Sequence, residues 1–382
     1  MSKPARRIAA LCLLGLALLA VFAWTPVHDN LQSVAALDLV GGKPVPPLLH
    51  RLVAEPVTTR DLTLPLPSGP VRARLYTPVN RPDAPAVVVL HGVHHLGIDE
   101  PRMIAFASAM ASCGIRVLTP ELPDIKDYHV GANSIATIGD SAAWLSQQSN
   151  GRPAGVMGLS FSGGLALLAA ADPIWQQHIK FVVAIGSQDE MSRVAAFYRT
   201  GTDLLPDGSE ETLTPHEYGA LVLEYEDLED FVPTPADLEP IRAVLRAHLY
   251  EDRAAEATAT ARLTHAQLAE ARQLMDTTSP LTRQRLAAAE ARHIQDMAGV
   301  SPHGHLDHLT TPVYLLHGAA DNIIPSAETQ WMEAELPSET LKAALISPVL
   351  SHLDMDGANP TFLDQLRLVH FFALVLHAAE SR

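Results

Sequence analysis

The stretch that most constrains this chain is a serine enclosed by small residues between an apolar run and a helix-forming run. Gly158 stands two residues before Ser160, and Ser162 stands two after it, followed directly by two glycines. Leucines and alanines then fill residues 165–171, and both types favour helix. The pattern predicts a strand, a sharp turn and a helix. A turn this tight strains the backbone of its central residue and requires small neighbours, which predicts that Ser160 stands at the tip.

A second register of the same turn would place Ser162 at the tip. In that register the bulky Leu165 stands three residues after the serine, where a small residue is required. We therefore take Ser160 as the central residue. A short pattern of this kind also occurs by chance in turns without any chemistry, so the rest of the chain has to decide its meaning.

Apolar runs alternate with helical patterns over most of the sequence. An antiparallel hairpin is expected first, from the alternating patterns at 61–67 and 71–76. Strands are predicted at 86–90, 115–120, 154–158, 181–186, 312–316 and 341–346, and helices at 101–113, 135–148, 327–336 and 360–379. This alternation predicts an α/β fold with a mostly parallel sheet and helices on both of its faces.

The alternation stops between residues 191 and 300. This stretch lacks β-branched runs and is rich in alanine, leucine, glutamate and arginine, with strong helical patterns at 258–275 and 281–297. We expect a helical insertion here, between a first part of the core at 60–190 and a second part at 301–382. The acidic run at 224–230 is interpreted as a solvated face.

The N-terminus combines basic residues with an uncharged apolar run. Lys3, Arg6 and Arg7 precede residues 8–24, a length at the short end for a membrane span and long for a signal peptide. We expect residues 1–25 to be an uncleaved membrane anchor, with removal as a signal peptide as the alternative. The basic residues predict that the body lies outside the cytoplasm, anchored, secreted or periplasmic. Residues 26–59 are rich in proline and glycine and predict a tether with one short helix.

Composition excludes some classes of function. The formal net charge of −16 argues against nucleic acid as a partner, because phosphates require a basic surface. Of the two cysteines, Cys12 lies in the apolar run, which leaves only Cys113 in the folded body and no disulfide within it.

Four separate motifs carry a family resemblance. His91-Gly92 follows the strand at 86–90, Ser160 stands in its turn, Asp321 follows His317 by four residues, and His352 follows the strand at 341–346. The order Ser, Asp, His and these positions after strands resemble the α/β-hydrolases. The resemblance covers about residues 60–382 and implies the α/β-hydrolase fold, with the insertion in the place of a cap.

The resemblance also implies roles for single residues. Ser160 would be the nucleophile, His352 its base, and Asp321 the group that orients His352. The backbone N–H groups of Val93 and Phe161 would form the oxyanion hole. The expected activity is that of a serine hydrolase that cleaves a carboxylic ester or related acyl bond of a small molecule, without a cofactor. Alternatives are a peptidase or thioesterase of the same fold, or a non-catalytic binding protein that retains the fold.

Other residues compete for these roles. Asp189, Asp354 and Asp356 are alternatives for the acid, and His370 and His377 for the base, although both of these histidines fall within a predicted helix. His94 and His95 would either contact substrate or fill space beneath the insertion. His303, His305, Asp307 and His308 form a cluster that we interpret as incidental, and no metal site is predicted.

Overall fold

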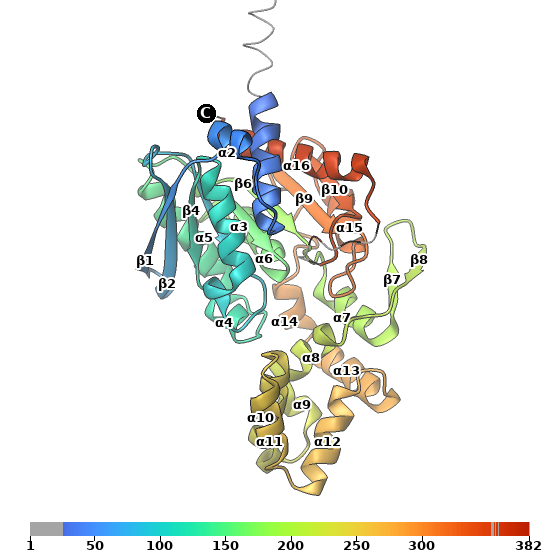
Figure 1. Cartoon of the computed structure of the whole chain (residues 1–382). Helices are drawn as coiled ribbons and strands as arrows, with labels where there is room; N and C mark the ends of the chain where they lie inside the picture. The colour runs from blue at the N-terminus through green and yellow to red at the C-terminus, as the bar shows by residue number, and fades with distance from the viewer. Residues whose placement is uncertain (1–25, 353–354, 356, 358, 382) are drawn as a thin grey trace, which may run out of the picture.

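The core of the molecule is an eight-stranded sheet with the order β1-β2-β4-β3-β5-β6-β9-β10. The computed structural model describes residues 26–352, 355, 357 and 359–381 (Figure 1). The strands are β1 Val57–Leu66, β2 Gly69–Pro78, β3 Ala86–Leu90, β4 Arg116–Pro120, β5 Ala154–Leu159, β6 Ile179–Ile185, β9 Val313–Gly318 and β10 Leu341–Ser347.

The strand pairings agree with the sequence pattern. β1 and β2 form the predicted antiparallel hairpin, and β2 also pairs antiparallel with β4. The other neighbours, from β4 through β3, β5, β6 and β9 to β10, are parallel. Every residue of β3 and β4 is buried, as expected for strands covered on both faces. The predicted α/β class is confirmed, and the strand order with its antiparallel second strand is that of the α/β-hydrolase fold.

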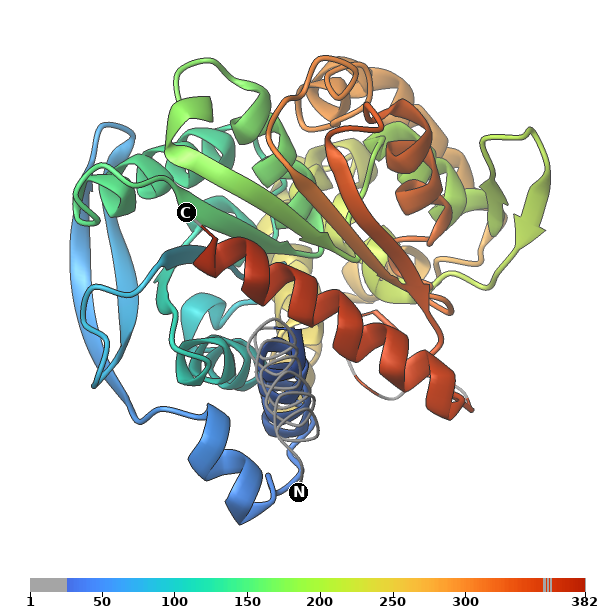
Figure 2. The ribbon, with the colours of Figure 1, turned by 90° about the horizontal axis from the view of Figure 1, so that it is seen from above.

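Helices cover both faces of the sheet. A helical segment at residues 26–40, α3 and α16 pack on one face, while α5, α6 and α15 pack on the other (Figures 1 and 2). The helices outside the insertion are α2 Pro47–Val53, α3 Pro101–Ser112, α4 Pro123–Lys126, α5 Asn133–Gln147, α6 Phe161–Ala171, α15 Ala327–Glu335 and α16 Phe362–Glu380, with short 3₁₀ turns at Gly97–Asp99 and Gln176–His178.

Helix α16 belongs to the core of the body. In the described part of the chain it is the one helix whose length and composition would allow it to cross a membrane. However, Phe371 packs edge-on against Tyr314 of β9, and Leu368, Phe372 and Val375 are buried beside it. The apolar character of α16 is therefore explained by its contact with the sheet.

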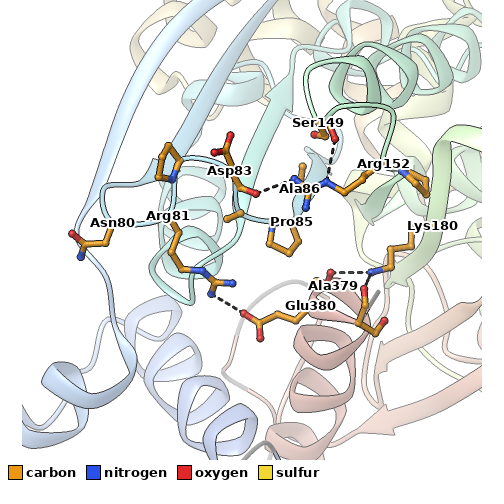
Figure 3. Close-up of a pocket in the computed structure, with 14 residues that line it drawn as sticks. Asn80, Arg81, Asp83, Pro85, Ala86, Ser149, Arg152, Lys180, Ala379 and Glu380 are labelled. Carbon is orange, nitrogen blue, oxygen red and sulfur yellow. Dashed lines mark hydrogen bonds and ion pairs between the residues drawn. The ribbon is translucent and has the colours of Figure 1, made fainter.

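The last turn of α16 is fixed at the amino-terminal edge of the sheet (Figure 3). Lys180 Nζ donates to the carbonyls of Ala379 at 2.9 Å and Ser381 at 2.5 Å, and Arg81 pairs with Glu380 at 2.7 Å. A pocket opens beside these residues, but its positive charges already have partners. Their role here is to hold the C-terminal helix.

The segment at residues 26–40 differs from the predicted tether. It is helical and packs on the body, where Gln32 Nε2 donates to the carbonyl of Cys113 at 2.9 Å and Asp29 meets His377 at 3.2 Å. Its helix is stabilised by these distant contacts, which a local reading of prolines and glycines at 41–47 does not contain. The predicted anchor or signal peptide at 1–25 lies outside the described residues.

The insertion forms a helical layer at one end of the molecule (Figure 1). The two long helices predicted at 258–275 and 281–297 are each broken in two, and Thr264 and Gln267 form a capping box that begins the second piece. A small two-stranded sheet, which was not predicted, lies between the first and second helices of the insertion. The elements of the insertion are α7 Met191–Thr200, β7 Thr202–Leu204, β8 Glu210–Thr212, α8 Glu217–Glu226, α9 Leu228–Phe231, α10 Pro235–Leu249, α11 Arg253–Thr260, α12 His265–Met275, α13 Pro280–Arg292 and α14 Ile294–Gly299.

The acidic run at 224–230 is only partly a solvated face. Glu224 is fully buried on the inner side of α8, and burial raises the pKa of its carboxyl well above the ordinary value. The prediction of a solvated face is therefore wrong for Glu224. Glu229 is exposed and pairs with Arg242 at 2.9 Å, which agrees with the prediction for the end of the run.

Candidate active site

Ser160 occupies the tip of the turn between β5 and α6. Its backbone has φ of 58° and ψ of −139°, a combination that residues other than glycine seldom adopt. Two glycines permit the turn. A Cβ on Gly158 would lie 2.4 Å from Cα of Gly163, and a Cβ on Gly163 would lie 1.9 Å from Oγ of Ser187. The small residues around Ser160 are therefore required by the close approach of Gly158 to Gly163 within the turn and of Gly163 to Ser187 after β6.

We expect Gly158→Ala to destabilise the protein and displace Ser160. The added methyl would collide with backbone atoms of Gly163, which cannot move away as a flexible side chain can. Overpacking of this kind costs about 1–3 kcal/mol. Urea unfolding measures the loss. Gly299→Ala is the matched control, because a Cβ there meets nothing within 4 Å, and an equal loss in both variants would contradict the explanation.

Ser162 has a structural role in the same turn. Its hydroxyl donates to the carbonyl of Leu159 at 2.7 Å and accepts from the N–H of Leu159 at 3.1 Å. The side chain is fully buried. Ser162 thus closes the turn on itself, and its hydroxyl is not presented at the tip, which favours the register with Ser160 at the centre.

Ser160, His352 and Asp321 meet at the carboxyl-terminal edge of the sheet. Ser160 Oγ lies 3.0 Å from Nε2 of His352, and Nδ1 of His352 lies 2.5 Å from Oδ2 of Asp321. Ser160 follows β5, Asp321 follows β9 and His352 follows β10, so three loops at one edge of the sheet supply the three side chains. The sequence predicted this set, and the structure brings its members into one hydrogen-bonded line.

The environment of Asp321 keeps its carboxylate charged. Burial by itself would raise the pKa, but the charge of His352 and hydrogen bonds from His317 and His352 outweigh it and hold the pKa of Asp321 well below its ordinary value. The second oxygen, Oδ1, accepts the N–H groups of Ile323 at 2.9 Å and Ile324 at 3.0 Å. Asp321 is thus a fixed anion with every oxygen occupied.

Gly186, directly after β6, has a left-handed backbone next to His352 and Asp321. Its φ is +60°, and a Cβ built there would lie 3.5 Å from Nδ1 of His352 and 3.4 Å from Oδ2 of Asp321. Gly318 is required by a closer approach, since a Cβ there would fall 1.5 Å from the carbonyl oxygen of Ser351. It lets the loop that carries His352 pack against the end of β9, and neither glycine was given this role from the sequence.

The turn after β3 leaves the sheet beside the serine turn, because Leu90 and Gly158 are partners in the parallel register. His91 holds this turn: its Nε2 accepts the N–H of Leu122 at 2.9 Å, and Nδ1 donates to the carbonyl of Gly92 at 2.8 Å. Complete burial lowers the pKa of His91 to about 4, so the imidazole is neutral. His91 therefore shapes the turn and has no proton-transfer role.

Val93 and Phe161, the two residues predicted to supply oxyanion donors, are both buried. Among the described residues neither backbone N–H has a hydrogen-bond acceptor. The carbonyl of Val93 is held from the insertion, because Tyr218 Oη of α8 donates to it at 2.8 Å. Tyr218 was missed at the sequence level, since no local pattern connects a tyrosine in a helix with a turn 125 residues earlier.

His94 and His95 connect this turn to the insertion. Their rings stack at 4.6 Å, and His95 stacks in turn on Tyr250 at 4.3 Å, just beyond α10. Burial lowers the pKa of both imidazoles, which favours their neutral forms. The packing accounts for their presence beneath the insertion, and contact with substrate stays a prediction.

The competing acids and histidines lie elsewhere. Asp189 is buried and bound to Arg193 at 2.8 Å, His377 pairs with Asp29, and His370 is exposed on α16. Asp354 and Asp356 lie outside the described residues.

In the cluster predicted to be incidental, only His303 joins other possible metal ligands, Asp189 and Glu335, whereas His305, Asp307 and His308 are exposed. Arg193 already neutralises Asp189, and nothing further indicates an ion there.

Comparison with known proteins gives similarity of fold alone. No protein-family model and no curated protein sequence matches the chain. Among solved structures, an esterase from Pyrobaculum calidifontis is 15% identical, with 93% of each chain covered and a TM-score of 0.46. Carboxyl esterase 2 from Tuber melanosporum is also 15% identical, over 84% of this chain and 86% of that one, with a TM-score of 0.46.

A third structure, 2-hydroxy-6-oxo-6-phenylhexa-2,4-dienoate hydrolase from Rhodococcus sp. strain RHA1, is 17% identical over 78% of this chain and 93% of that one, with a TM-score of 0.39. Identities this low transfer no residue's role to this protein. The strand order defines the chain as an α/β-hydrolase-fold protein, and its chemistry has to be derived from its own site.

Proposed function

We propose that the protein is a serine hydrolase that cleaves a carboxylic ester or a related acyl bond of a small molecule. The observation that carries the proposal is the line from Ser160 through His352 to Asp321, with distances of 3.0 and 2.5 Å. A serine hydroxyl is a weak nucleophile at neutral pH and needs a base within hydrogen-bond reach. The geometry supports this role for His352, whose tautomer Asp321 would fix.

In this mechanism Ser160 Oγ attacks the acyl carbon while His352 Nε2 takes the hydroxyl proton. The tetrahedral intermediate collapses when His352 gives that proton to the leaving group, which leaves an acyl group on Ser160. A water molecule, deprotonated by His352, then attacks the acyl carbon and releases the acid. Throughout, Asp321 remains an anion and stabilises the imidazolium, which agrees with its lowered pKa.

The negative charge that forms on the acyl oxygen would be stabilised by the N–H groups of Phe161 and Val93. Phe161 is the first residue of α6, so its N–H points out of the helix N-terminus, where a negative charge is favoured. The loss of a single such donor costs about 3–4 kcal/mol in other hydrolases.

The direct test is labelling with a fluorophosphonate probe followed by mapping of the modified peptide. We expect one adduct, on Ser160, and none in a His352→Ala variant, because without the base the hydroxyl is not activated. Turnover of p-nitrophenyl esters of increasing acyl length, with thioester and peptide substrates in parallel, would then define the bond cleaved. A folded protein that the probe leaves unlabelled would favour a binding protein that retains the fold.

Tyr218→Phe is expected to lower kcat about 3- to 10-fold with little change in KM. The substitution removes one hydrogen bond to the carbonyl of Val93, worth about 1 kcal/mol, and leaves the ring in place. Tyr218 would act as a positioning residue through the Val93 N–H. Steady-state kinetics on an ester measure the effect, with Tyr225→Phe, a neighbour on α8, as control. A rise in KM at unchanged kcat would contradict this role.

A further inference from the structure

One end of the molecule carries an unusual concentration of exposed apolar side chains. Leu48 and Leu52 on α2 and Phe362, Leu363 and Leu366 on the first turns of α16 are all exposed, Leu48 by 72% and Phe362 by 75%. Val27, near the start of the described part of the 26–40 helix, is also exposed. These three elements lie at the end opposite the insertion (Figure 1), with α2 and the first turns of α16 on opposite sides of the 26–40 helix (Figure 2). We call these six residues the α2/α16 surface.

The α2/α16 surface is not explained by the core. On α2, Val53 is the buried residue, while Leu48 and Leu52 stand four apart and share one exposed side of the helix. On α16, burial begins at Leu368, and Thr361 begins the helix with a capping box before it reaches the sheet. Elsewhere in the described chain, large exposed apolar residues are scattered singly, at Val79, Leu96, Ile174, Leu204, Leu281 and Ile294.

The position of this surface indicates what covers it. The described part of the helix at 26–40 has its first residues at this end, and the sequence before it contains the uncharged apolar run at 8–24. The chain therefore enters the body at the place where apolar side chains are displayed. Exposed basic groups accompany them: His50 and Arg51 lie on α2, which has no acidic residue, and Lys43 precedes it.

We propose that the α2/α16 surface rests on a lipid bilayer when the apolar run at 8–24 is inserted. The leucines and the phenylalanine would reach the boundary between head groups and acyl chains, roughly 5–10 Å deep, with Arg51 and Lys43 beside the lipid phosphates. Acidic residues accompany the basic ones, since Glu55 follows α2 and Asp364 lies between Leu363 and Leu366, so the proposed contact depends on the apolar side chains. This surface is independent of the proposed hydrolase activity.

The proposal also orients the molecule. The insertion lies at the end of the body away from the α2/α16 surface (Figure 1). With this surface on the bilayer, the insertion would extend into the aqueous phase.

The test uses the full chain with Cys12→Ser, inserted into vesicles of phosphatidylcholine and phosphatidylglycerol. Single cysteines introduced as Leu48→Cys, Leu52→Cys, Phe362→Cys or Leu363→Cys carry an environment-sensitive fluorophore. Cys113 stays unlabelled because it is buried, and burial raises the pKa of its thiol to about 12. Matched controls are Ile174→Cys and Leu281→Cys, which are exposed apolar positions away from the surface.

We expect nitroxide-bearing lipids to quench the four surface labels several-fold more strongly than the two controls. Equal quenching at all six positions, strong or weak, would overturn the proposal. Shielding of the surface labels that appears in lipid-free detergent and rises with protein concentration would also overturn it, because the surface would then contact a second copy of the chain. Ester turnover measured on the same samples reports separately on the site.

Discussion

Replacement of Ser160 by alanine is expected to reduce kcat for a short p-nitrophenyl ester by about 10⁴- to 10⁶-fold. The hydroxyl lies 3.0 Å from Nε2 of His352 and is the atom that would form the acyl-enzyme. Without it, only oriented water and the oxyanion donors remain. The fold should persist, because alanine removes a single atom at a turn whose backbone bonds, such as Ser160 N–H to the carbonyl of Ile185, are unchanged.

Ser162→Ala is the matched control for this prediction. It removes a hydroxyl two residues away that bonds only backbone groups, so we expect a loss of about 1 kcal/mol in stability with probe labelling retained. The opposite outcome, in which Ser162→Ala is inactive and Ser160→Ala retains turnover, would reverse the register of the turn. His352→Ala should resemble Ser160→Ala, and the double variant should be little worse than either, because the two residues act as a unit.

Asp321→Asn is expected to lower kcat by about 10⁴-fold while KM changes little. An amide is nearly the same size, but its NH₂ group cannot accept the Nδ1–H of His352. The ring would then turn or change tautomer, and Nε2 would no longer accept the Ser160 proton. Asp189→Asn is the control, since that buried acid contacts Arg193 and lies away from His352. Equal losses in both variants would show that buried charge in general, and not this contact, supports activity.

The same variant predicts a change in acid stability. Because the pKa of Asp321 is held below its ordinary value, its ionised form stabilises the folded state at pH values above the unfolded pKa. This contribution is lost as the pH falls from about 4 toward the folded pKa. The gap in unfolding free energy between the parent protein and Asp321→Asn should therefore be widest near neutral pH and narrow in acid. A difference in unfolding free energy that stays constant with pH would contradict the conclusion that Asp321 is ionised in the folded protein.

Local sequence was sufficient to predict those parts of the fold whose conformation is determined by steric contacts between residues close in the chain. The small residues around Ser160 predicted a turn that the close approach of Gly158 and Gly163 explains. The buried β3 and the hairpin of β1 and β2 followed from apolar continuity and alternation. The pairing of Asp321 with His352 needed the family resemblance as well, because nothing in either loop alone indicates the other.

Contacts between distant segments could not be predicted in this way. The bond from Tyr218 to Val93 and the burial of Glu224 depend on how α8 is turned against the body, and a helix rich in apolar residues does not specify this. The helix at 26–40 was expected to be part of a tether because its stabilising partners, Cys113 and His377, are far along the chain. In each case the conformation is determined by contacts between segments that are far apart in the sequence.

The hydrogen bond between Tyr218 and Val93 has a consequence for how a substrate would enter. It joins the insertion to the turn that would supply an oxyanion donor, so α8 cannot swing outward unless this bond breaks. With α8 moved outward, an ester and water could enter, but the N–H of Val93 would no longer be held in position as an oxyanion donor, and hydrolysis would be slow. Hydrolysis would become fast again only when α8 returns and the Tyr218 hydroxyl bonds the carbonyl of Val93 again, so substrate entry and hydrolysis would occur in different positions of α8.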